Sequence, residues 1–320
     1  MTTFTTDEIQ SALDEITQEN DQNNGFISVE YTEKDTIIVR YRDMKYRTHD
    51  ARDSIDITSS AEGKKRKISI NYEEGPDITL SFGHVDEHPP MEKSDEMVGE
   101  MGGDQCRNSN RMNYYGTISF YSKSVSYEAS GRCNSRCTAA PALVSNNHVI
   151  ARSDAGQRGE SIWTPFRSDV ARLECFVPLR CISSADFAMA KVNNMAGITT
   201  WTVRTIGRLA GVRRPRIGEG IKKHGARTGY TTGRVTGQSN IRVGSYTYYR
   251  VFVTNGGFGC AGDSGSSVVA NNNDLVGIYS WGDDVPCSNN PRGYFWTLEN
   301  PGSLNHDNHS TQVSIDTSND

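Results

Sequence analysis

The amino-acid sequence predicts an all-β protein that is preceded by a small α+β domain. From residue 102 onward, short runs rich in β-branched and aromatic residues are broken by Gly, Asn and Ser, with little helical periodicity. Evenly spaced short strands of this kind are typical of a β-barrel or a β-sandwich. The first hundred residues have a different composition, since they carry 23 acidic and 11 basic side chains in a chain whose total net charge is −5. This shift places a domain boundary near residue 100.

Residues 1–90, called the extension below, begin with a predicted amphipathic helix over residues 6–20. Thr6 is its candidate N-cap, and acidic residues follow in the first turn. Apolar residues recur along the segment at helical spacing: Ile9, Leu13 and Ile16. This pattern predicts a helix with one apolar face.

Two similar segments follow the helix, at residues 27–41 and 68–82. Each alternates apolar and polar residues and breaks at a polar turn, so we expect two β-hairpins in one sheet. Residues 91–101 then read as a polar linker. The extension could inhibit the remainder of the chain, recruit a substrate or promote oligomerisation, and the sequence leaves these roles open. An acidic extension and a basic body could also dock electrostatically or be solvated separately.

Composition argues against several classes of partner. No apolar run approaches the roughly 20 residues that a membrane-spanning helix needs, so no membrane partner is expected. Residues 1–8 have neither the basic start nor the apolar core of a signal peptide, which makes the cytoplasm the default expectation. The basic run Lys64–Lys67 is short, and no long basic tract predicts a nucleic-acid partner.

The stretch Gly259–Ser266 carries the strongest chemical signal, because two glycines bracket an Asp-Ser pair ahead of a predicted buried strand. A serine hydroxyl becomes an effective nucleophile when a base takes its proton and nearby donors hold the oxyanion. Gly262 permits a tight turn in which the amides of Gly262 and Ser264 can point at one spot. The tetrapeptide alone is equally compatible with an ordinary polar turn.

Two upstream segments give the serine a context. His148 directly follows a hydrophobic run in Ser145–Ile150, and Asp186 stands at the start of the predicted strand within residues 184–190. The order His148, Asp186, Ser264 resembles the catalytic triad of the chymotrypsin-like (trypsin-fold) serine peptidases. The segments SNNHVIA, DFAMAKV and GDSGSSVV are similar to that family's TAAHC, DIALLKL and GDSGGPVV.

The residues in these motifs are more similar to those of a mostly bacterial and fungal branch of this family. That branch carries a GG…GT lead-in, LSNNHV, KxGRTTGxTxG.V and GDSGS. The chain offers Gly102-Gly103 and Gly116-Thr117, and the sequence KHGARTGYTTGRV at residues 223–235. The resemblance covers residues 102–300 and leaves the first hundred residues uncovered.

The resemblance implies two six-stranded antiparallel barrels within residues 102–304, with His148 and Asp186 on the first and Ser264 on the second. It also implies that His148 is the general base, that Asp186 orients its imidazole, and that the amides of Gly262 and Ser264 form the oxyanion hole. The implied activity is that of a serine endopeptidase on protein or peptide substrates, without a metal or other cofactor. The alternative is a catalytically silent trypsin-fold protein with a binding or regulatory role.

The same resemblance identifies candidate residues of the substrate pocket. Phe258 would form its floor, Ser280, Trp281 and Gly282 one wall, and Arg292 the opposite wall. Phe258 offers no charge to a basic side chain, whereas an unpaired Arg292 in a partly dry pocket calls for a carboxylate. We therefore expect cleavage after Asp or Glu. The alternative is an Arg292 turned to solvent beside a shallow pocket for small apolar residues.

The chain has seven cysteines. The resemblance implies a disulfide between Cys260 and Cys287, and Cys175 and Cys181 are close enough in sequence to clip a hairpin. Three further cysteines could supply other bridges, with a connectivity that sequence leaves open: Cys106, Cys133 and Cys137. Zinc is not expected, because the Cys133–Cys137 pair has no second ligand pair at suitable spacing. The cysteine pattern suits an oxidising compartment, so localisation stays open.

The two ends of the peptidase region raise separate expectations. Residues 305–320 are polar and are predicted to form a disordered tail. The segment Met97–Glu100 faintly resembles the N-terminus that trypsin-like zymogens expose on activation. In such a zymogen the new ammonium would pair with the aspartate before the serine, here Asp263.

Overall fold

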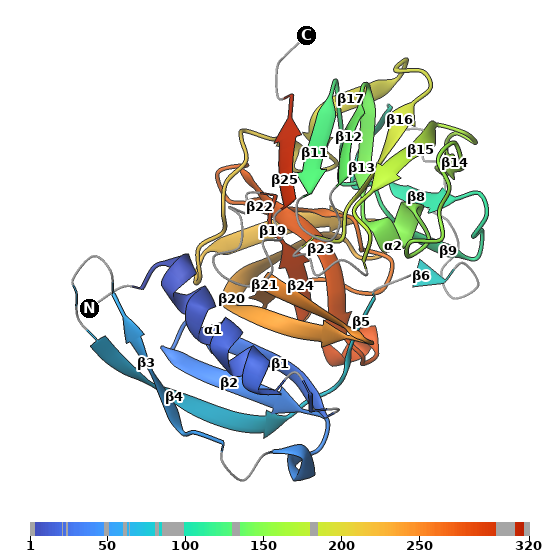
Figure 1. Cartoon of the computed structure of the whole chain (residues 1–320). Coiled ribbons are helices and arrows are strands. Elements are labelled where there is room, and N and C mark those ends of the chain that lie inside the picture. The colour runs from blue at the N-terminus through green and yellow to red at the C-terminus, as the bar shows by residue number, and fades with distance from the viewer. Residues whose placement is uncertain are drawn as a thin grey trace.

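The computed structural model describes residues 4–20, 22–23, 25–47, 51–59, 63, 65–80, 83–84, 99–129, 135–179, 185–298 and 311–316. The protein is mostly β, with a long helix confined to the N-terminal part (Figure 1). The predicted all-β class with a small helix-bearing extension is therefore confirmed. The described helical elements are α1 (Thr6–Asn20), α2 (Asn147–Ile150) and two 3-10 turns at Met44–Tyr46 and Cys287–Asn289.

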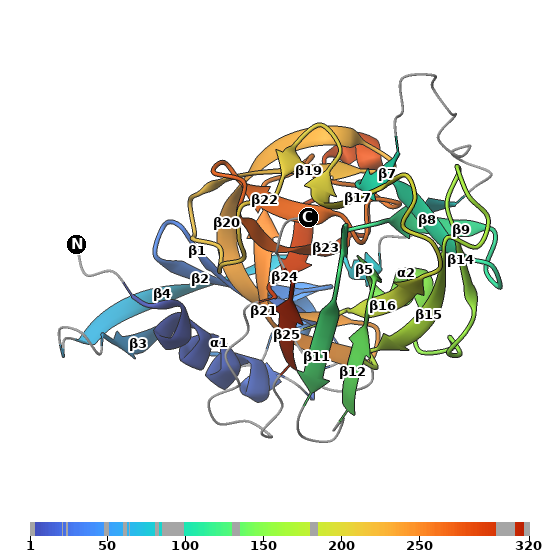
Figure 2. The same ribbon diagram turned by 90° about the horizontal axis from the view of Figure 1, so that it is seen from above.

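The extension folds as one helix packed against four strands, as Figure 2 shows beside the rest of the molecule. Helix α1 has the predicted bounds, and its three apolar residues are buried: Ile9, Leu13 and Ile16. Strand β1 (Phe26–Thr32) pairs antiparallel with β2 (Thr36–Tyr41), which confirms the first hairpin. Strand β2 continues parallel to β4 (Lys65–Glu74), and β4 pairs antiparallel with β3 (Ser54–Thr58).

The second predicted hairpin is wrong. Strand β5 (Ile78–Leu80) does not fold back on β4, because β2 and β3 already take the two edges of that strand. Instead, β5 pairs antiparallel with β23 (Leu275–Asp283), far away in sequence. Strand β5, near the end of the extension, is thus paired with a strand of the C-terminal half of the chain.

The C-terminal half of the chain forms a closed barrel, called the second lobe below. Strand order runs β19-β22-β23-β24-β21-β20, and an additional β19–β20 pairing closes the ring. Every pairing in this ring is antiparallel, so the predicted six-stranded antiparallel barrel is found here. Besides β23, its strands are β19 (Gly220–Gly225), β20 (Gly229–Val243), β21 (Tyr246–Thr254), β22 (Ser267–Ala270) and β24 (Gly293–Trp296).

The first lobe is built on an eight-stranded sheet in the order β10-β13-β16-β15-β14-β8-β9-β6. Its strands are β6 (Gly83–His84), β8 (Gln105–Asn108), β9 (Tyr114–Thr117), β10 (Phe120–Ser122), β13 (Ala142–Ser145), β14 (Ser161–Trp163), β15 (Ala171–Phe176) and β16 (Ala188–Val192). Two small sheets complete it: β7 (Glu100–Gly102) with β17 (Ile198–Val203) and β18 (Gly207–Arg208), and β11 (Val125–Ala129) with β12 (Ser135–Ala139) and β25 (Thr311–Ile315).

Strand β25 corrects the expectation of a disordered tail. It pairs antiparallel with β11 over five residue pairs, from Val125 opposite Ile315 to Ala129 opposite Thr311. Val313 and Ile315 alternate with polar residues and pack against the main hydrophobic core, which explains why this polar segment forms a strand. Residues 305–310 and 317–320 of the predicted tail lie outside the described part of the chain.

The extension and the second lobe share one sheet, because β1 pairs antiparallel with β20 over five residue pairs. Helix α1 crosses β20, and Gln10 donates a hydrogen bond to the Asn240 side chain at 2.8 Å. An ion pair also joins the two parts, since Asp7 Oδ1 of the extension lies 3.3 Å from Arg250 Nη1 of the second lobe. Of the two arrangements considered above, the acidic extension docks on the basic body.

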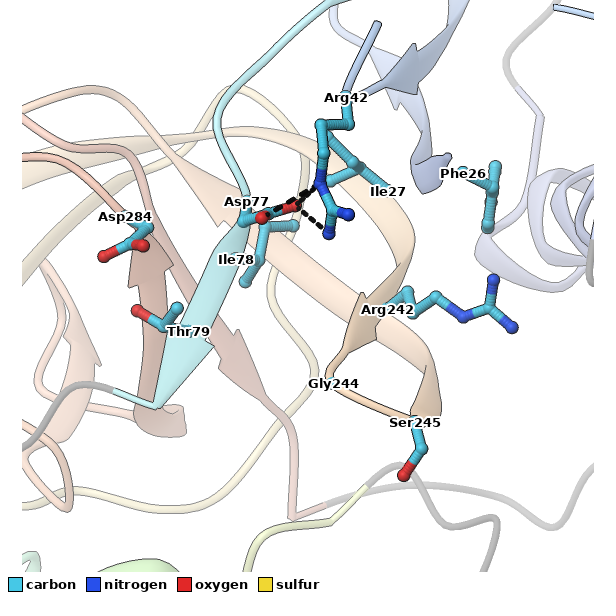
Figure 3. Close-up of a pocket in the computed structure, with 10 residues that line it drawn as sticks. All are labelled: Phe26, Ile27, Arg42, Asp77, Ile78, Thr79, Arg242, Gly244, Ser245 and Asp284. Carbon is cyan, nitrogen blue, oxygen red and sulfur yellow. Dashed lines mark hydrogen bonds and ion pairs between the residues drawn. The ribbon is translucent and has the colours of Figure 1, made fainter. Parts of the chain in front are cut away.

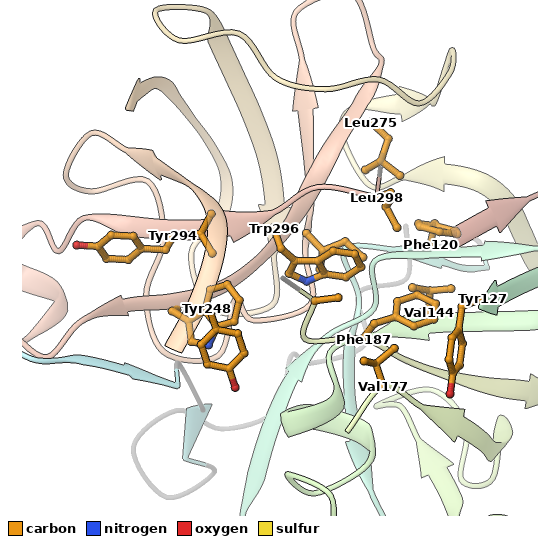
Figure 4. Packing of buried hydrophobic residues seen from close by; sticks show 14 of the residues in the cluster. Phe120, Tyr127, Val144, Val177, Phe187, Tyr248, Leu275, Tyr294, Trp296 and Leu298 are labelled. Carbon is orange, nitrogen blue, oxygen red and sulfur yellow. The ribbon is translucent and has the colours of Figure 1, made fainter. Parts of the chain in front are cut away.

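The two lobes meet in an aromatic core that Figure 4 shows from close by. Phe187 of the first lobe contacts Trp296 of the second edge to face, with ring centroids 5.7 Å apart. Both rings are buried. Because Phe187 follows Asp186 directly, this contact holds the aspartate at the boundary between the lobes.

Candidate active site

The serine predicted as nucleophile lies in a loop between β21 and β22, which we call the nucleophile loop (Gly259–Gly265). Ser264 is buried, and its Oγ donates a hydrogen bond to the carbonyl oxygen of Ser280 on β23 at 3.0 Å. From the first lobe, the amide of Thr117 donates to the carbonyl oxygen of Ser264 at 2.7 Å. Both lobes therefore hold the serine in place.

Backbone geometry of the nucleophile loop depends on its glycines. Gly262 has a φ of +102°, and a Cβ at this position would come within 2.8 Å of the Tyr115 ring. Glycine is the residue that adopts such a conformation without a steric penalty. The amides of Asp263 and Gly265 bond inward, to the carbonyls of Cys260 and Tyr279 at 2.9 Å each. The predicted oxyanion donors, the amides of Gly262 and Ser264, belong to this same turn.

The structure brings His148 and Asp186 together. His148 lies on the short helix α2, and its Nδ1 is hydrogen-bonded to Asp186 Oδ2. The second oxygen of Asp186 accepts a hydrogen bond from the His148 amide at 3.1 Å. Both side chains are buried. A carboxylate that bonds Nδ1 fixes the imidazole so that Nε2 is the nitrogen available for proton transfer.

Strand β23 links the histidine segment to the nucleophile loop. Asn146, two residues before His148, donates from its side chain to the Tyr279 carbonyl at 2.8 Å. The neighbouring carbonyl, that of Ser280, accepts the Ser264 hydroxyl. Asn146 belongs to the SNNHV motif, and its side chain makes this anchoring contact.

Asp263 is held by a buried ion pair that sequence reasoning did not find. Lys223 on β19 is fully buried, and its Nζ lies 3.0 Å from Asp263 Oδ2. Thr228 donates a hydroxyl hydrogen bond to the same oxygen at 2.7 Å. Burial on its own would raise the pKa of Asp263, but the Lys223 ammonium and the Thr228 hydrogen bonds hold the pKa below its ordinary value. Met97 and Val98 of the zymogen-like segment lie outside the described residues.

A pocket of about 200 Å³ opens beside the nucleophile loop. Its lining includes Gly259, Ala261, Gly282 and Arg227 of the second lobe, and Thr79 and Leu80 of β5. Of the five predicted pocket residues, Gly282 is thus found in the lining. Trp281 instead packs against Tyr248 in a tilted arrangement with ring centroids 4.6 Å apart, and Phe258 is buried in the core of the second lobe.

Arg292 does not have the environment that the predicted acidic specificity required. Its Nε donates to Asp283 Oδ2 at 2.9 Å, and its Nη1 lies 3.6 Å from Glu30 of the extension. The premise of an unpaired cation in the pocket is therefore wrong, because two carboxylates already neutralise this guanidinium.

The structure joins Cys260 to Cys287 by a disulfide with a Cα–Cα distance of 5.6 Å, which ties the nucleophile loop to the pocket wall. Cys175 pairs with Cys137 at 6.5 Å, so the expected Cys175–Cys181 clip is wrong. Cys133 and Cys181 lie outside the described residues. The thiol of Cys106 is free, and burial raises its pKa to about 12. Two disulfides are typical of proteins from an oxidising compartment.

A larger cavity, of about 550 Å³, lies between the extension and the second lobe (Figure 3). Asp77 and Arg42 pair at its edge at 2.9 Å, and Ile78 and Thr79 of β5 line it.

Within the described ranges, no group of three or more His, Cys, Asp or Glu could hold a metal ion. None of the helices in the described part of the chain combines the length and the hydropathy of a membrane-spanning segment.

The fold and the site together define a two-lobed β protein in which a histidine is hydrogen-bonded to an aspartate on the first lobe, and a buried serine lies in a loop of the second lobe that the first lobe contacts. A sequence model of the family described as Trypsin matches residues 115–299, more than half of the chain. The chain belongs to the trypsin family.

Comparisons with solved structures found proteases. The Nocardiopsis protease NAPase has 16% sequence identity and a TM-score of 0.44, over 62% of this chain and 92% of that one. Cellulomonas bogoriensis chymotrypsin has 19% identity and a TM-score of 0.42, over 62% and 91%. A glutamic acid-specific serine protease has 17% identity and a TM-score of 0.42, over 62% and 94%. A search of curated proteins found no match.

Proposed function

We propose that this chain is a serine endopeptidase that cleaves peptide bonds through an acyl-enzyme on Ser264. The observation that carries the proposal is the convergence on β23: the Ser264 hydroxyl and the Asn146 side chain of the histidine segment bond to adjacent carbonyls of this strand. The family membership of the chain supports the same reaction class.

In the proposed reaction, the Ser264 hydroxyl exchanges its hydrogen bond to Ser280 for one to the imidazole of His148. Oγ attacks the carbonyl carbon of the peptide, and His148 takes the hydroxyl proton. The carbonyl oxygen becomes an oxyanion that the amides of Gly262 and Ser264 stabilise. The C–N bond then breaks, and His148 gives its proton to the leaving amine. Water, deprotonated by the same imidazole, hydrolyses the ester and restores Ser264.

Asp186 acts through His148 in this proposal. Its hydrogen bond to Nδ1 keeps the imidazole in the tautomer that accepts a proton at Nε2, and its negative charge stabilises the imidazolium that forms. The buried Phe187–Trp296 contact limits the movement of this aspartate. No step of the proposed mechanism needs a metal or an organic cofactor.

A fluorophosphonate probe tests the proposal, because it forms a stable adduct with an activated serine. We expect labelling of Ser264, located by tandem mass spectrometry, and no adduct in Ser264→Ala. The alternative of a silent binding protein predicts a folded chain without an adduct. Absence of labelling in the intact chain and also in Thr79→Pro, which loosens β5 beside the serine, contradicts the proposed function.

A further inference from the structure

Strand β5 of the extension lies on the edge of β23 next to the proposed nucleophile. The antiparallel register places Leu80 opposite Trp281, Thr79 opposite Gly282 and Ile78 opposite Asp283. The residue before Trp281 is Ser280, whose carbonyl accepts the Ser264 hydroxyl at 3.0 Å. The C-terminal end of β5 therefore points along β23 towards Ser264.

Strand β6 continues the same path on the first lobe. Gly83 pairs with Tyr115 and His84 with Tyr114, again antiparallel. Strand β9, which carries these tyrosines, also carries Thr117, whose amide bonds to the Ser264 carbonyl at 2.7 Å. Figure 1 shows β5 beside β23 and β6 beside β9, on the two lobes. The two strands thus flank the nucleophile loop.

Only two residues separate Leu80 from Gly83. Three steps of extended chain cover at most about 11 Å, so the Cα atoms of Leu80, paired with the second lobe, and Gly83, paired with the first lobe, lie within about that distance of each other. An extended peptide commonly binds a protein by adding a strand to an exposed sheet edge. The edges of β23 at residues 281–283 and of β9 at residues 114–115, called the docking edges below, are therefore where a peptide substrate would bind.

We propose that β5 and β6 occupy the docking edges as an intramolecular, substrate-like inhibitor, and that a peptide substrate binds after they are displaced. The part of this inference that concerns hydrolysis rests on the proposed function. The part that concerns peptide binding stands independently of catalysis, since it needs only the two strand pairings.

The local packing of β5 is consistent with a strand that can dissociate from β23. Strand β5 is three residues long, and of these only Ile78 is buried. Thr79 lines both the 200 Å³ pocket and the 550 Å³ cavity of Figure 3, so open space adjoins the strand at two places. The firm attachment of the extension lies elsewhere, in the five-pair ladder between β1 and β20.

Gly83 is a second position at which a substitution can weaken the pairing, here that between β6 and β9. A Cβ on Gly83 would lie 2.3 Å from the ring of Tyr115, a side chain that is itself buried. The close approach of β6 to β9 therefore requires a glycine, and Gly83→Val should push β6 off its edge. On β5, Thr79→Pro weakens the pairing because proline has no amide hydrogen to donate.

The experiment measures peptide binding in chains that carry Ser264→Ala, so that no peptide is consumed. A fluorescent peptide with the sequence of residues 76–86 is titrated against Ser264→Ala alone and with Thr79→Pro or Gly83→Val. We expect each opening substitution to lower Kd at least about tenfold, a change worth about 1.4 kcal/mol. Thr58→Pro, at the end of the outer edge strand β3, is the matched control and should leave Kd unchanged.

Parallel assays in the Ser264 background separate this inference from the proposed function. If Thr79→Pro and Gly83→Val raise both peptide binding and peptide hydrolysis, both ideas are supported. Tighter binding without any hydrolysis supports the occupied docking edges and contradicts the peptidase. Binding that neither opening variant improves, with both variants folded by circular dichroism, overturns the inference whatever the hydrolysis shows. The two variants act on different strands, so misfolding of one leaves the other as the test.

Discussion

The hydroxyl of Ser264 makes one side-chain hydrogen bond in the structure, to the Ser280 carbonyl. Removing it should cost little stability, whereas the proposed reaction has no nucleophile without it. We predict that Ser264→Ala lowers kcat/KM for peptide hydrolysis by about 10⁴-fold or more and leaves thermal unfolding nearly unchanged. Near-normal hydrolysis by the purified variant would show that another group is the nucleophile.

Lys223 supports the nucleophile loop through its ion pair with Asp263. It is fully buried against Asp263, and removing one partner of a buried ion pair leaves the other charge without compensation. We predict that Lys223→Met lowers the free energy of unfolding by about 3–5 kcal/mol. Lys222→Met is the matched control, because the Lys222 ammonium bonds to Asn273 at 2.7 Å in a half-buried position. Urea unfolding that gives equal losses for both variants contradicts this role.

His224 should make stability depend on pH. Burial, with the nearby charges of Arg204 and Lys223, lowers its pKa from 6.5 to about 4, although Asp263 acts in the opposite direction. The folded state therefore favours the neutral imidazole, and stability is lost as pH falls from about 6.5 towards about 4.

The corresponding variant is His224→Gln, which keeps a polar group beside Thr205, the present partner of His224 Nδ1 at 3.0 Å. The free energy of unfolding of the natural chain should fall by up to about 3 kcal/mol between about pH 7 and about pH 4.5 through this residue. The variant should lose distinctly less over the same range, as measured by urea titration at both pH values. Parallel pH profiles would exclude His224 as the source.

At the scale of elements, short sequence motifs predicted the candidate catalytic residues and helix α1, because these signals are local, and they missed strand pairings between distant segments. His148, Asp186 and Ser264 each stand in a local pattern, and the structure brings the first two into hydrogen-bonding contact and anchors the third on the same strand as the histidine segment. Helix α1 was equally predictable from its apolar spacing, because that signal lies within the element itself.

A short stretch of sequence does not show which partner a strand pairs with, because that depends on which strand edges other segments of the chain already cover. The alternation in residues 68–82 correctly indicated strands, but the partner of β5 was decided by β2 and β3, which flank β4. Likewise, Val313 and Ile315 form a strand because β11 offers an edge. The Lys223–Asp263 pair spans 40 positions, and one of the two carboxylates that neutralise Arg292, that of Glu30, lies far away in the extension. Sequence spacing carries no signal for contacts of this range.

The whole molecule should unfold with the extension and the second lobe as one cooperative unit, because β1 and β20 belong to one sheet. Leu13 is fully buried on α1, and we predict that Leu13→Ala costs about 2–5 kcal/mol. All four tryptophans lie beyond residue 160, outside the extension. The tryptophan fluorescence transition should nevertheless shift to lower urea by the amount seen in far-ultraviolet circular dichroism. An unchanged fluorescence transition would indicate an extension that unfolds by itself.

Because β5 and β6 belong to the same chain as the strands with which they pair, the proposed inhibition should not depend on protein concentration. A separate inhibitor dissociates when its concentration falls below Kd, whereas a tethered segment keeps a fixed effective concentration, commonly millimolar for a short connection. The fraction of open molecules is then the same in a dilute and in a concentrated solution. A competing peptide must exceed this local concentration, weighted by the two affinities, before it binds. Under the proposed inhibition, the substrate threshold is set by chain length and geometry, and we expect Thr79→Pro on β5 and Gly83→Val on β6 to lower it.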